Sequence, residues 1–424
     1  MTGALRRPRR WLDGPVGPAL VEAVGLFLAL RIGLTLMGLF VAVDAEPPGP
    51  CHFELAFNGW RTLPALDDGP VSFPFLGVWQ RWDACWYEKI ATYGYEPAEN
   101  SVAFFPLYPL VITVASLLTL GDLVLAGIVV SAVAYVAGVT GLLVLVGEDF
   151  GARLARRTAL YLSLFPAAFF LLAPFTESLF LALSIWTLIA ARRWAWGPAA
   201  LLGLLAALTR PQGLLLVAPV AWEAWRAWRD PAADGHAPGP MTEPADGAPA
   251  ARATPVEPRG WRRRAGALVA SGAPIVGLAL YAGIAQIVAG ETPFEAQDLW
   301  GGRSFYPPWE VVEASARWIV ERGDAMQLLN LVSLLGAAAL LAAGVGRLPL
   351  SYLLYAVPQL LLVGSRIQPT PLTSTTRYVL VLFPIFVVLA WLTARRPWRT
   401  AWLVGSTLFL GLLTYRFLIG DFVA

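Results

Sequence analysis

A few charged residues of this sequence stand in or beside apolar runs, where a charge needs a specific reason. Arg31 falls in the middle of the apolar run 19–43, and Glu177 lies inside the run "FFLLAPFTESLFLAL". An ionisable residue in such a run is costly unless it faces a polar cavity. Arg210 and Arg377 adjoin the ends of two other apolar runs, and arginine binds phosphate through paired hydrogen bonds. These residues are therefore candidates for a polar site within an apolar protein.

Asp83 belongs to an aromatic-rich segment that reads "RWDACWYEKIATYGY". On a helix that begins near Asp83, the side chains of Trp86, Tyr87, Ile90 and Tyr93 share one face, which predicts a short amphipathic helix at the membrane interface. A carboxylate at the start of a helix accepts backbone N–H groups and stays ionised. Asp83 is therefore either a helix cap beside an aromatic belt or a reactive carboxylate.

The composition excludes a soluble protein. Of the 424 residues, 57% are hydrophobic and 14% are charged, whereas soluble domains carry about 25% charged residues. The formal net charge is +2, which gives no electrostatic support for a nucleic-acid partner. We therefore expect an integral membrane protein surrounded by membrane lipids.

A membrane-spanning helix needs roughly 20 mostly apolar residues. On this criterion we predict an all-α polytopic membrane protein with about eleven transmembrane helices. The apolar runs are 19–43, 122–147, 158–174, 178–191, 195–209, 211–225, 265–289, 326–344, 348–364, 378–394 and 400–419.

The arginines predict the orientation, because cytoplasmic loops carry an excess of basic residues. An N-terminal arginine cluster at 6–10 places that end in the cytoplasm, and the first run acts as an uncleaved anchor. The later clusters can also be cytoplasmic only if residues 104–147 cross the membrane once. We therefore expect the proline-broken run 104–120 to lie at the outer interface.

The sequence predicts that the chain divides into three parts. Residues 1–229 form an N-terminal module with a long outer loop over 44–121. Residues 230–259, rich in proline, alanine and glycine, are expected to be a disordered cytoplasmic loop. Residues 260–424 supply the C-terminal transmembrane helices.

Several motifs occur together in the order of a known family. "WDACWYEKIATYGY" followed by "AFFPLYP" resembles the first-loop signature of the PIG-V-type mannosyltransferases, which include GPI mannosyltransferase II. "ARRTALYLSLFPAAFFLLAPFTESLFLALS", "LLAALTRPQGLLL" and "TSTTRYVLVLFPIF" resemble later segments of the same family. The resemblance implies the GT-C glycosyltransferase fold, whose first outer loop contains two interfacial helices.

The resemblance also implies a reaction. GT-C enzymes take a sugar from a polyprenyl-phosphate carrier on the outer face, and Asp83 matches the position of the family's catalytic aspartate. Asp83 would be the general base, and a single displacement would invert the anomeric configuration. Arg210 and Arg377 would stabilise the leaving phosphate or, alternatively, only reach the lipid headgroups.

Glu177 would bind sugar or acceptor, or else cap a helix. The remaining candidates for donor binding are Trp82, Tyr87, Arg31, Tyr378 and Gln212, with Arg303 and Arg366 as weaker neighbours.

The resemblance leaves the partners open in part. The donor would be a polyprenyl-phosphate hexose, which the resemblance implies is mannose, and the acceptor a lipid, polysaccharide or protein hydroxyl at a bacterial plasma membrane. No Asp-x-Asp motif accompanies Asp83, so we expect no metal cofactor. The alternative is a transporter or lipid flippase, although that class places charges near the midplane of several helices.

Both cysteines, Cys51 and Cys85, fall in the predicted outer loop. A disulfide is permitted outside the cytoplasm, and a bridge would tie the start of the loop to the residues beside Asp83. Two free thiols are the alternative.

Overall fold

The computed structural model describes residues 16–44, 72–96, 100–229, 259–299, 305–367 and 370–423. These residues form helices, and none of them belongs to a β-strand. The all-α fold predicted from the apolar runs is therefore confirmed. The expected cytoplasmic loop, 230–259, falls almost wholly outside the described residues.

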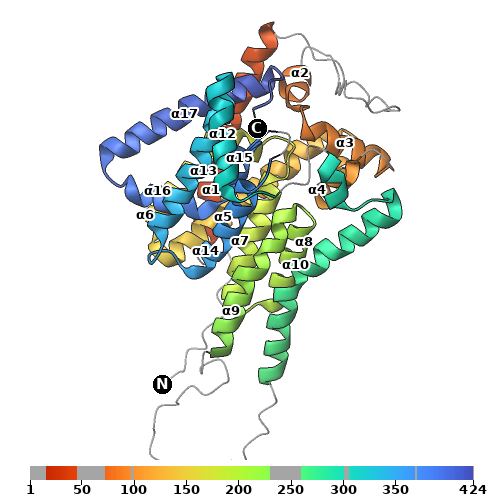
Figure 1. Cartoon of the computed structure of the whole chain (residues 1–424), viewed down its shortest axis with the longest axis vertical. Coiled ribbons are helices and arrows are strands. Elements are labelled where there is room, and N and C mark those ends of the chain that lie inside the picture. Colours follow the sequence, from red (N-terminus) through yellow and green to blue (C-terminus); the bar gives the residue numbers. More distant parts are fainter. Residues whose placement is uncertain are drawn as a thin grey trace, which may run out of the picture.

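Among the residues that the structure describes, five helices are long and apolar enough to cross a membrane (Figure 1). They are α1 (Val16–Asp44), α5 (Leu123–Phe150), α10 (Arg259–Ala289), α13 (Ala325–Gly344) and α17 (Arg396–Leu418). They confirm a polytopic membrane protein.

The other apolar runs form shorter helices. They are α4 (Leu107–Ser116), α6 (Ala152–Ser163), α7 (Glu177–Arg192), α8 (Trp196–Ala207), α9 (Val217–Arg229), α14 (Leu350–Gly364) and α16 (Phe383–Leu392). The number of crossings stays a prediction.

Three predicted spans are not continuous helices, which corrects the sequence interpretation. The run 158–174 leaves α6 at Ser163 and continues as irregular turns with the 3-10 helix η4 (Ala168–Leu171). The run 211–225 is split between the 3-10 helix η5 (Pro211–Leu216) and α9, and 378–394 between α15 (Thr375–Leu380) and α16. Prolines explain the breaks, because proline cannot donate the helical hydrogen bond and restricts the residue before it.

The helices of the predicted outer loop pack against the bundle. The helix α3 (Asp83–Tyr93) begins at the residue that the sequence predicts, and it packs on α4 and α5. Its face of Trp86, Tyr87 and Ile90 is buried, whereas Tyr93 is half-buried. The ten residues of α4 span only about 15 Å, half of the hydrocarbon core, which supports an interfacial position for 104–120.

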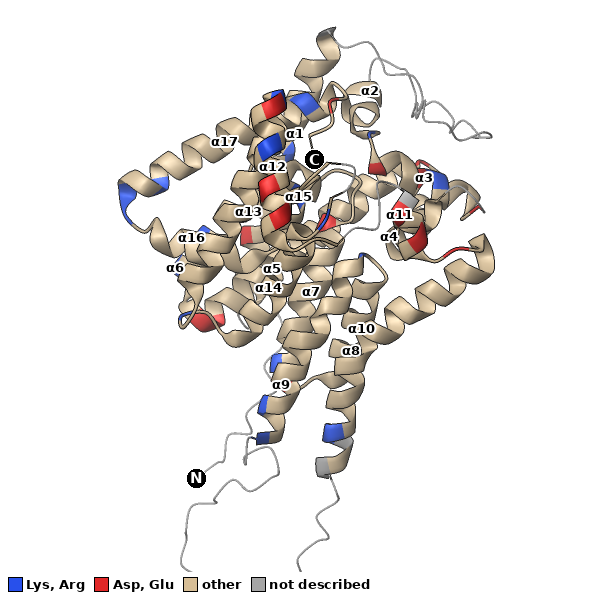
Figure 2. Cartoon of the chain, viewed as in Figure 1, with Lys and Arg blue, Asp and Glu red and all other residues tan. Residues whose placement is uncertain are grey.

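The two ends of the molecule differ in their charge. The helix α9 ends and α10 begins with arginines at the lower end in Figure 2, where α9 and α10 lie side by side. The helix α3 and the C-terminal end of the chain lie at the opposite end (Figure 1). This separation is what the arginine-based topology predicts for a two-sided membrane protein.

Candidate active site

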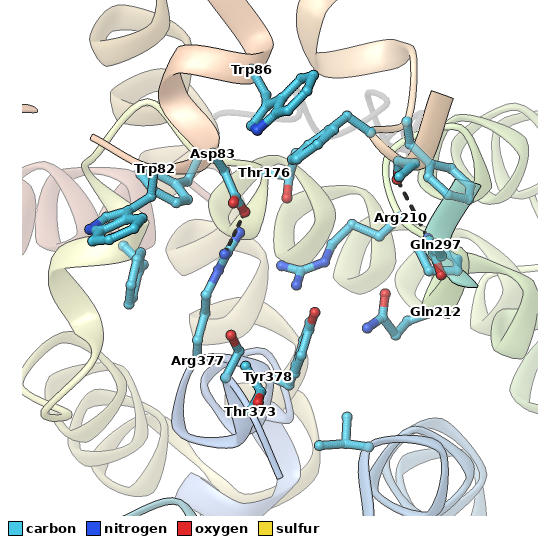
Figure 3. A pocket seen from close by; sticks show the side chains of 18 of the residues that line it. Trp82, Asp83, Trp86, Thr176, Arg210, Gln212, Gln297, Thr373, Arg377 and Tyr378 are labelled. Atoms are coloured by element: carbon cyan, nitrogen blue, oxygen red, sulfur yellow. Dashed lines mark hydrogen bonds and ion pairs between the residues drawn. The ribbon is translucent and has the colours of Figure 1, made fainter. Parts of the chain in front are cut away.

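A pocket of ≈ 540 Å³ lies beside the start of α3. Aromatic and other apolar side chains make most of its wall, and charged and amide groups converge within it (Figure 3). The polar lining residues used below are Asp83, Thr176, Arg210, Gln212, Gln297, Arg366, Arg377 and Tyr378. A largely apolar pocket with a few convergent polar groups is the usual form of a ligand site.

Helix starts and helix breaks supply the charged groups. Asp83 is the first residue of α3, and Glu177 is the first residue of α7, three positions after Pro174. Arg210 lies between α8 and η5 in extended backbone, the conformation that a following proline favours. Arg377 lies in α15, the short helix that is separated from α16. These helix breaks leave backbone and side-chain groups that can face a cavity. Within a membrane, non-helical backbone is tolerated only where it lines a cavity or is buried in protein.

The segment that carries Arg377 is fixed by a polar contact to a transmembrane helix. The Oδ1 atom of Asn330, in α13, accepts hydrogen bonds from the backbone N–H of Thr376 at 3.0 Å and from its hydroxyl at 2.9 Å. Asn330 is buried, and a buried amide is costly unless its groups are paired. The contact therefore ties the position of Arg377 to α13.

The four charged residues form one alternating series. Nη1 of Arg377 donates to Oδ2 of Asp83 at 2.6 Å, and its Nε donates to Oε1 of Glu177. Nη1 of Arg210 donates to the same Oε1 atom at 2.7 Å. Two carboxylates thus balance two guanidinium groups, which is the condition for burying such charges. The residues come together from parts of the chain up to 294 positions apart.

Aromatic rings flank both guanidinium groups. Arg377 lies over the rings of Phe175 at 4.7 Å and Phe170 at 5.1 Å, and Arg210 lies over Tyr378 at 5.0 Å. A guanidinium carries five N–H donors, so each arginine keeps donors beyond those used by the carboxylates. The arrangement can bind a phosphate group without first breaking the ion pairs.

Asp83 and Glu177 differ in their access to the pocket. The side chain of Asp83 is 29% exposed and lines the pocket. Glu177 is 0% exposed and is not among the lining residues. Glu177 therefore contacts the arginines from behind the wall, which differs from the expected contact with sugar or acceptor. Neither carboxylate acts mainly as a helix cap, because each pairs with arginine.

Tyr87 closes the pocket next to Asp83. Burial, together with the nearby Asp83 carboxylate, raises the pKa of the Tyr87 hydroxyl well above its usual value, so the phenol stays neutral. A hydrogen bond joins this hydroxyl to the side chain of Thr176. The Tyr87 ring meets Phe104 and Tyr108 edge to face, at 5.6 and 5.0 Å, which fixes the orientation of α3.

The structure brings together most of the residues singled out from the sequence. Asp83, Trp82, Tyr87, Arg210, Gln212, Arg377 and Tyr378 all line the pocket, and Arg366 does too. Arg31 does not; its guanidinium lies 5.5 Å from the Trp79 ring in the buried contact between α1 and the loop. Arg303 lies outside the described residues.

The structure describes only one of the two cysteines in the predicted disulfide. Cys85 is disulfide-bonded, and Cys51, the other cysteine of the sequence, lies outside the described residues. The pairing of the two stays a prediction.

Other lining residues were not found from the sequence. Gln297 lies in α11 (Pro293–Leu299) and receives a contact from Arg366 (Nη2 to Oε1, 3.4 Å). Phe417, Phe422 and Val423 come from the C-terminal end of the chain. No local pattern marks them, because a polar residue in a short helix and apolar residues after a span are common everywhere.

Comparison with known proteins gives one match. Residues 34–224 match the family model described as Mannosyltransferase (PIG-V). No curated protein and no solved structure matches the chain. The matched range contains Asp83, Glu177 and Arg210, but it ends before Arg377.

Proposed function

We propose that this chain, whose residues 34–224 match the family model described as Mannosyltransferase (PIG-V), transfers mannose from a polyprenyl-phosphate carrier to an acceptor hydroxyl. A membrane mannosyltransferase needs a base for the acceptor, positive charge for the leaving phosphate and an opening toward lipid. The observation that carries the proposal is the partly exposed Asp83 carboxylate held beside Arg377 and Arg210 in one largely apolar pocket.

The proposed reaction is a single displacement. The acceptor oxygen forms a bond to the anomeric carbon while the bond from that carbon to the phosphate oxygen breaks, and the polyprenyl phosphate leaves with the electron pair. Asp83 accepts the proton of the acceptor hydroxyl as the new bond forms. Because the nucleophile attacks opposite to the leaving group, the anomeric configuration is inverted.

Each remaining charged residue has a separate role in this proposal. Arg377 and Arg210 use their remaining N–H donors to bind the phosphate whose charge develops in the transition state. Glu177, buried behind them, fixes the direction of both guanidinium groups and does not touch the substrate. The arginines supply the positive charge, so the mechanism that we propose includes no metal ion.

We also propose that the pocket faces the outside of the cell. The arginine-bearing ends of α9 and α10 would lie in the cytoplasm, and α3 with the pocket lies at the other end of the molecule. The apolar wall of Trp86, Phe104 and Phe105 offers a path for an isoprenoid chain that enters from the membrane.

The test is a transfer assay with purified protein in detergent or liposomes. Radiolabelled polyprenyl-phosphate mannose is incubated with lipid extract from the host, and the labelled product is identified. Asp83→Asn keeps the size of the side chain and should abolish transfer, whereas the same isosteric change at an exposed position of α12 (Pro308–Arg322), Glu321→Gln, should leave the rate unchanged. Wild-type turnover in Asp83→Asn would exclude Asp83 as the base.

A further inference from the structure

The backbone immediately before Asp83 adopts a conformation that a bulky residue rarely adopts. Trp82 has φ 51° and ψ −120°, in the region of positive φ where a side chain with a Cβ atom meets steric conflict. Trp82 lies directly before Asp83, the first residue of α3. The backbone conformation of Trp82 therefore sets the direction in which the Asp83 side chain points. A strained conformation of this kind persists only when surrounding contacts hold it.

Those contacts come from the other end of the chain. We define the C-terminal segment as residues 418–423, which begin at the last residue of α17. The indole N–H of Trp82 donates to the backbone carbonyl of Asp421 at 3.3 Å. The Phe422 ring meets the indole edge to face, with 5.0 Å between the ring centroids and an angle of 77°. The segment thus contacts both the polar and the apolar part of the Trp82 side chain.

Arg81, the residue before Trp82, makes a second contact with the C-terminal segment. Nη2 of the buried Arg81 donates to the carbonyl of Leu418 at 3.0 Å, and its Nη1 donates to the carbonyl of Gln80 at 3.2 Å. Burial lowers the pKa of Arg81 to about 10, which is still far above neutral, so the guanidinium remains a charged donor. Hydrogen bonds from charged donors are stronger than neutral ones.

The C-terminal segment is itself anchored beside the arginine site. Phe417 is buried and lies 5.6 Å from Phe170 and 5.9 Å from Phe175, the rings that flank Arg377. The N–H of Asp421 donates to the carbonyl of Arg416 at 2.9 Å, which turns the chain back after the helix. Phe417, the residue directly before the segment, therefore packs on the rings that flank Arg377, and the segment itself contacts Trp82, the residue before Asp83.

We propose that the C-terminal segment is a positioning element of the active site, which holds Trp82 in its positive-φ conformation and thereby directs the Asp83 carboxylate toward Arg377 and the acceptor. Phe422 and Val423 also line the pocket, so the segment closes the wall that it supports. The inference rests on the proposed function for its kinetic consequences, but its structural consequence is independent of any substrate.

Deletion of residues 419–424 tests the proposal. The deletion removes the Asp421 carbonyl and Phe422 but leaves the Leu418 carbonyl that Arg81 binds. We expect kcat to fall ~10- to 100-fold, as small misplacements of a catalytic group do, while KM for the donor changes less than about threefold. Asp421→Ala is the matched control, since it keeps the carbonyl and removes only an exposed ion pair with Arg416, which contributes little.

A second comparison separates positioning from simple loss of contact. Trp82→Gly and Trp82→Ala both remove the indole, but glycine adopts positive φ without steric cost. We therefore expect Trp82→Gly to retain more activity than Trp82→Ala. Deletion of 419–424 should then cost less in the Trp82→Gly background than in the wild type, because the two changes act on one feature.

Hydrogen exchange followed by mass spectrometry gives a readout without substrate. The deletion should raise exchange in peptides that cover residues 80–90 and leave exchange in α5 unchanged. Unchanged exchange in 80–90, a loss confined to KM, or equal effects of the deletion in both Trp82 backgrounds would each overturn the proposal. A wild-type protein without transferase activity would instead overturn the proposed function, while the exchange result would still decide this inference.

Discussion

Glu177 is the residue on which the charge balance of the site depends. Its Oε1 atom accepts hydrogen bonds from both Arg210 and Arg377, and its side chain has no exposed surface. Removing one partner of a buried ion pair costs more than removing an exposed pair, since it leaves a charge without its counterion. The same carboxylate also sets the direction of both phosphate-binding groups in the proposed mechanism.

We predict that Glu177→Gln lowers the free energy of unfolding by about 3–5 kcal/mol and also lowers kcat/KM. The variant leaves two guanidinium groups sharing a neutral amide. Thermal unfolding in detergent measures the first effect and the transfer assay the second. Glu313→Gln is the control, because Glu313 pairs with Arg317 in an exposed i,i+4 contact that contributes less than about 1 kcal/mol. Equal melting temperatures for the two variants would contradict the assignment.

Glu88 gives a residue-scale prediction that depends on pH. It is buried in α3, and burial raises its pKa from 4.5 to about 8, with partial compensation by the hydrogen bond from Gln80 at 2.5 Å. The folded state therefore binds a proton that the unfolded state releases between these pH values. Stability falls as the pH rises from about 5 to 8, by at most about 1.4 kcal/mol per pH unit.

The expected result for Glu88→Gln follows from this fall in stability with rising pH. The neutral variant should unfold at nearly the same temperature as the wild type at pH 5 and at a higher temperature at pH 8. Melting curves measured across this range at constant ionic strength provide the check. A difference between the two proteins that does not change with pH would show that Glu88 is ionised in the folded protein.

At the scale of elements, a close turn after α8 positions Arg210 in the pocket wall. The N–H of Gly213 donates to the carbonyl of Arg210 at 2.9 Å, and the backbone of Ala206 and Ala207 passes directly beside Gly213. A Cβ atom at position 213 would lie 2.5 Å from the Ala207 Cα atom. Only glycine allows η5 to approach the end of α8 this closely.

We therefore predict that Gly213→Ala destabilises the protein by about 1–3 kcal/mol, the usual cost of overpacking, and weakens donor use because Arg210 is displaced. Gly197→Ala is a matched control in α8, since no atom lies within 4 Å of its added Cβ; alanine also favours helix at that site. Thermal unfolding and the KM for the donor report the two effects. Wild-type values for Gly213→Ala would show that the turn can relax.

The elements also show which features the sequence could predict. Apolar runs located most of the helices, and the aromatic spacing located α3 at Asp83, because both signals are local. The breaks at 164–176 and 381–382 were missed, since total hydrophobicity does not distinguish a continuous helix from a proline-interrupted one. The contacts of Arg377 with Asp83 and Glu177 join residues 294 and 200 positions apart, and no local pattern encodes such pairs.

On the scale of the whole molecule, the few charges are sorted between two ends. Arginines gather where α9 ends and α10 begins, and the pocket with its balanced ion pairs lies toward the other end (Figure 2). The helix α5 is long enough to join the two ends, because its 28 residues extend about 42 Å. Residues that flank α5 should therefore lie on opposite sides of the membrane.

Cysteine labelling of two positions tests this topology. We predict that Leu120→Cys, which precedes α5 and is fully exposed, reacts with a membrane-impermeant maleimide in intact cells. Ala152→Cys, at the exposed start of α6, should react only after the membrane is permeabilised. The unsubstituted chain is the control: if Cys51 and Cys85 form a disulfide, it takes up label only after reduction. Labelling of both positions in intact cells would mean that α5 does not cross the membrane, and the reverse pattern would place the pocket in the cytoplasm.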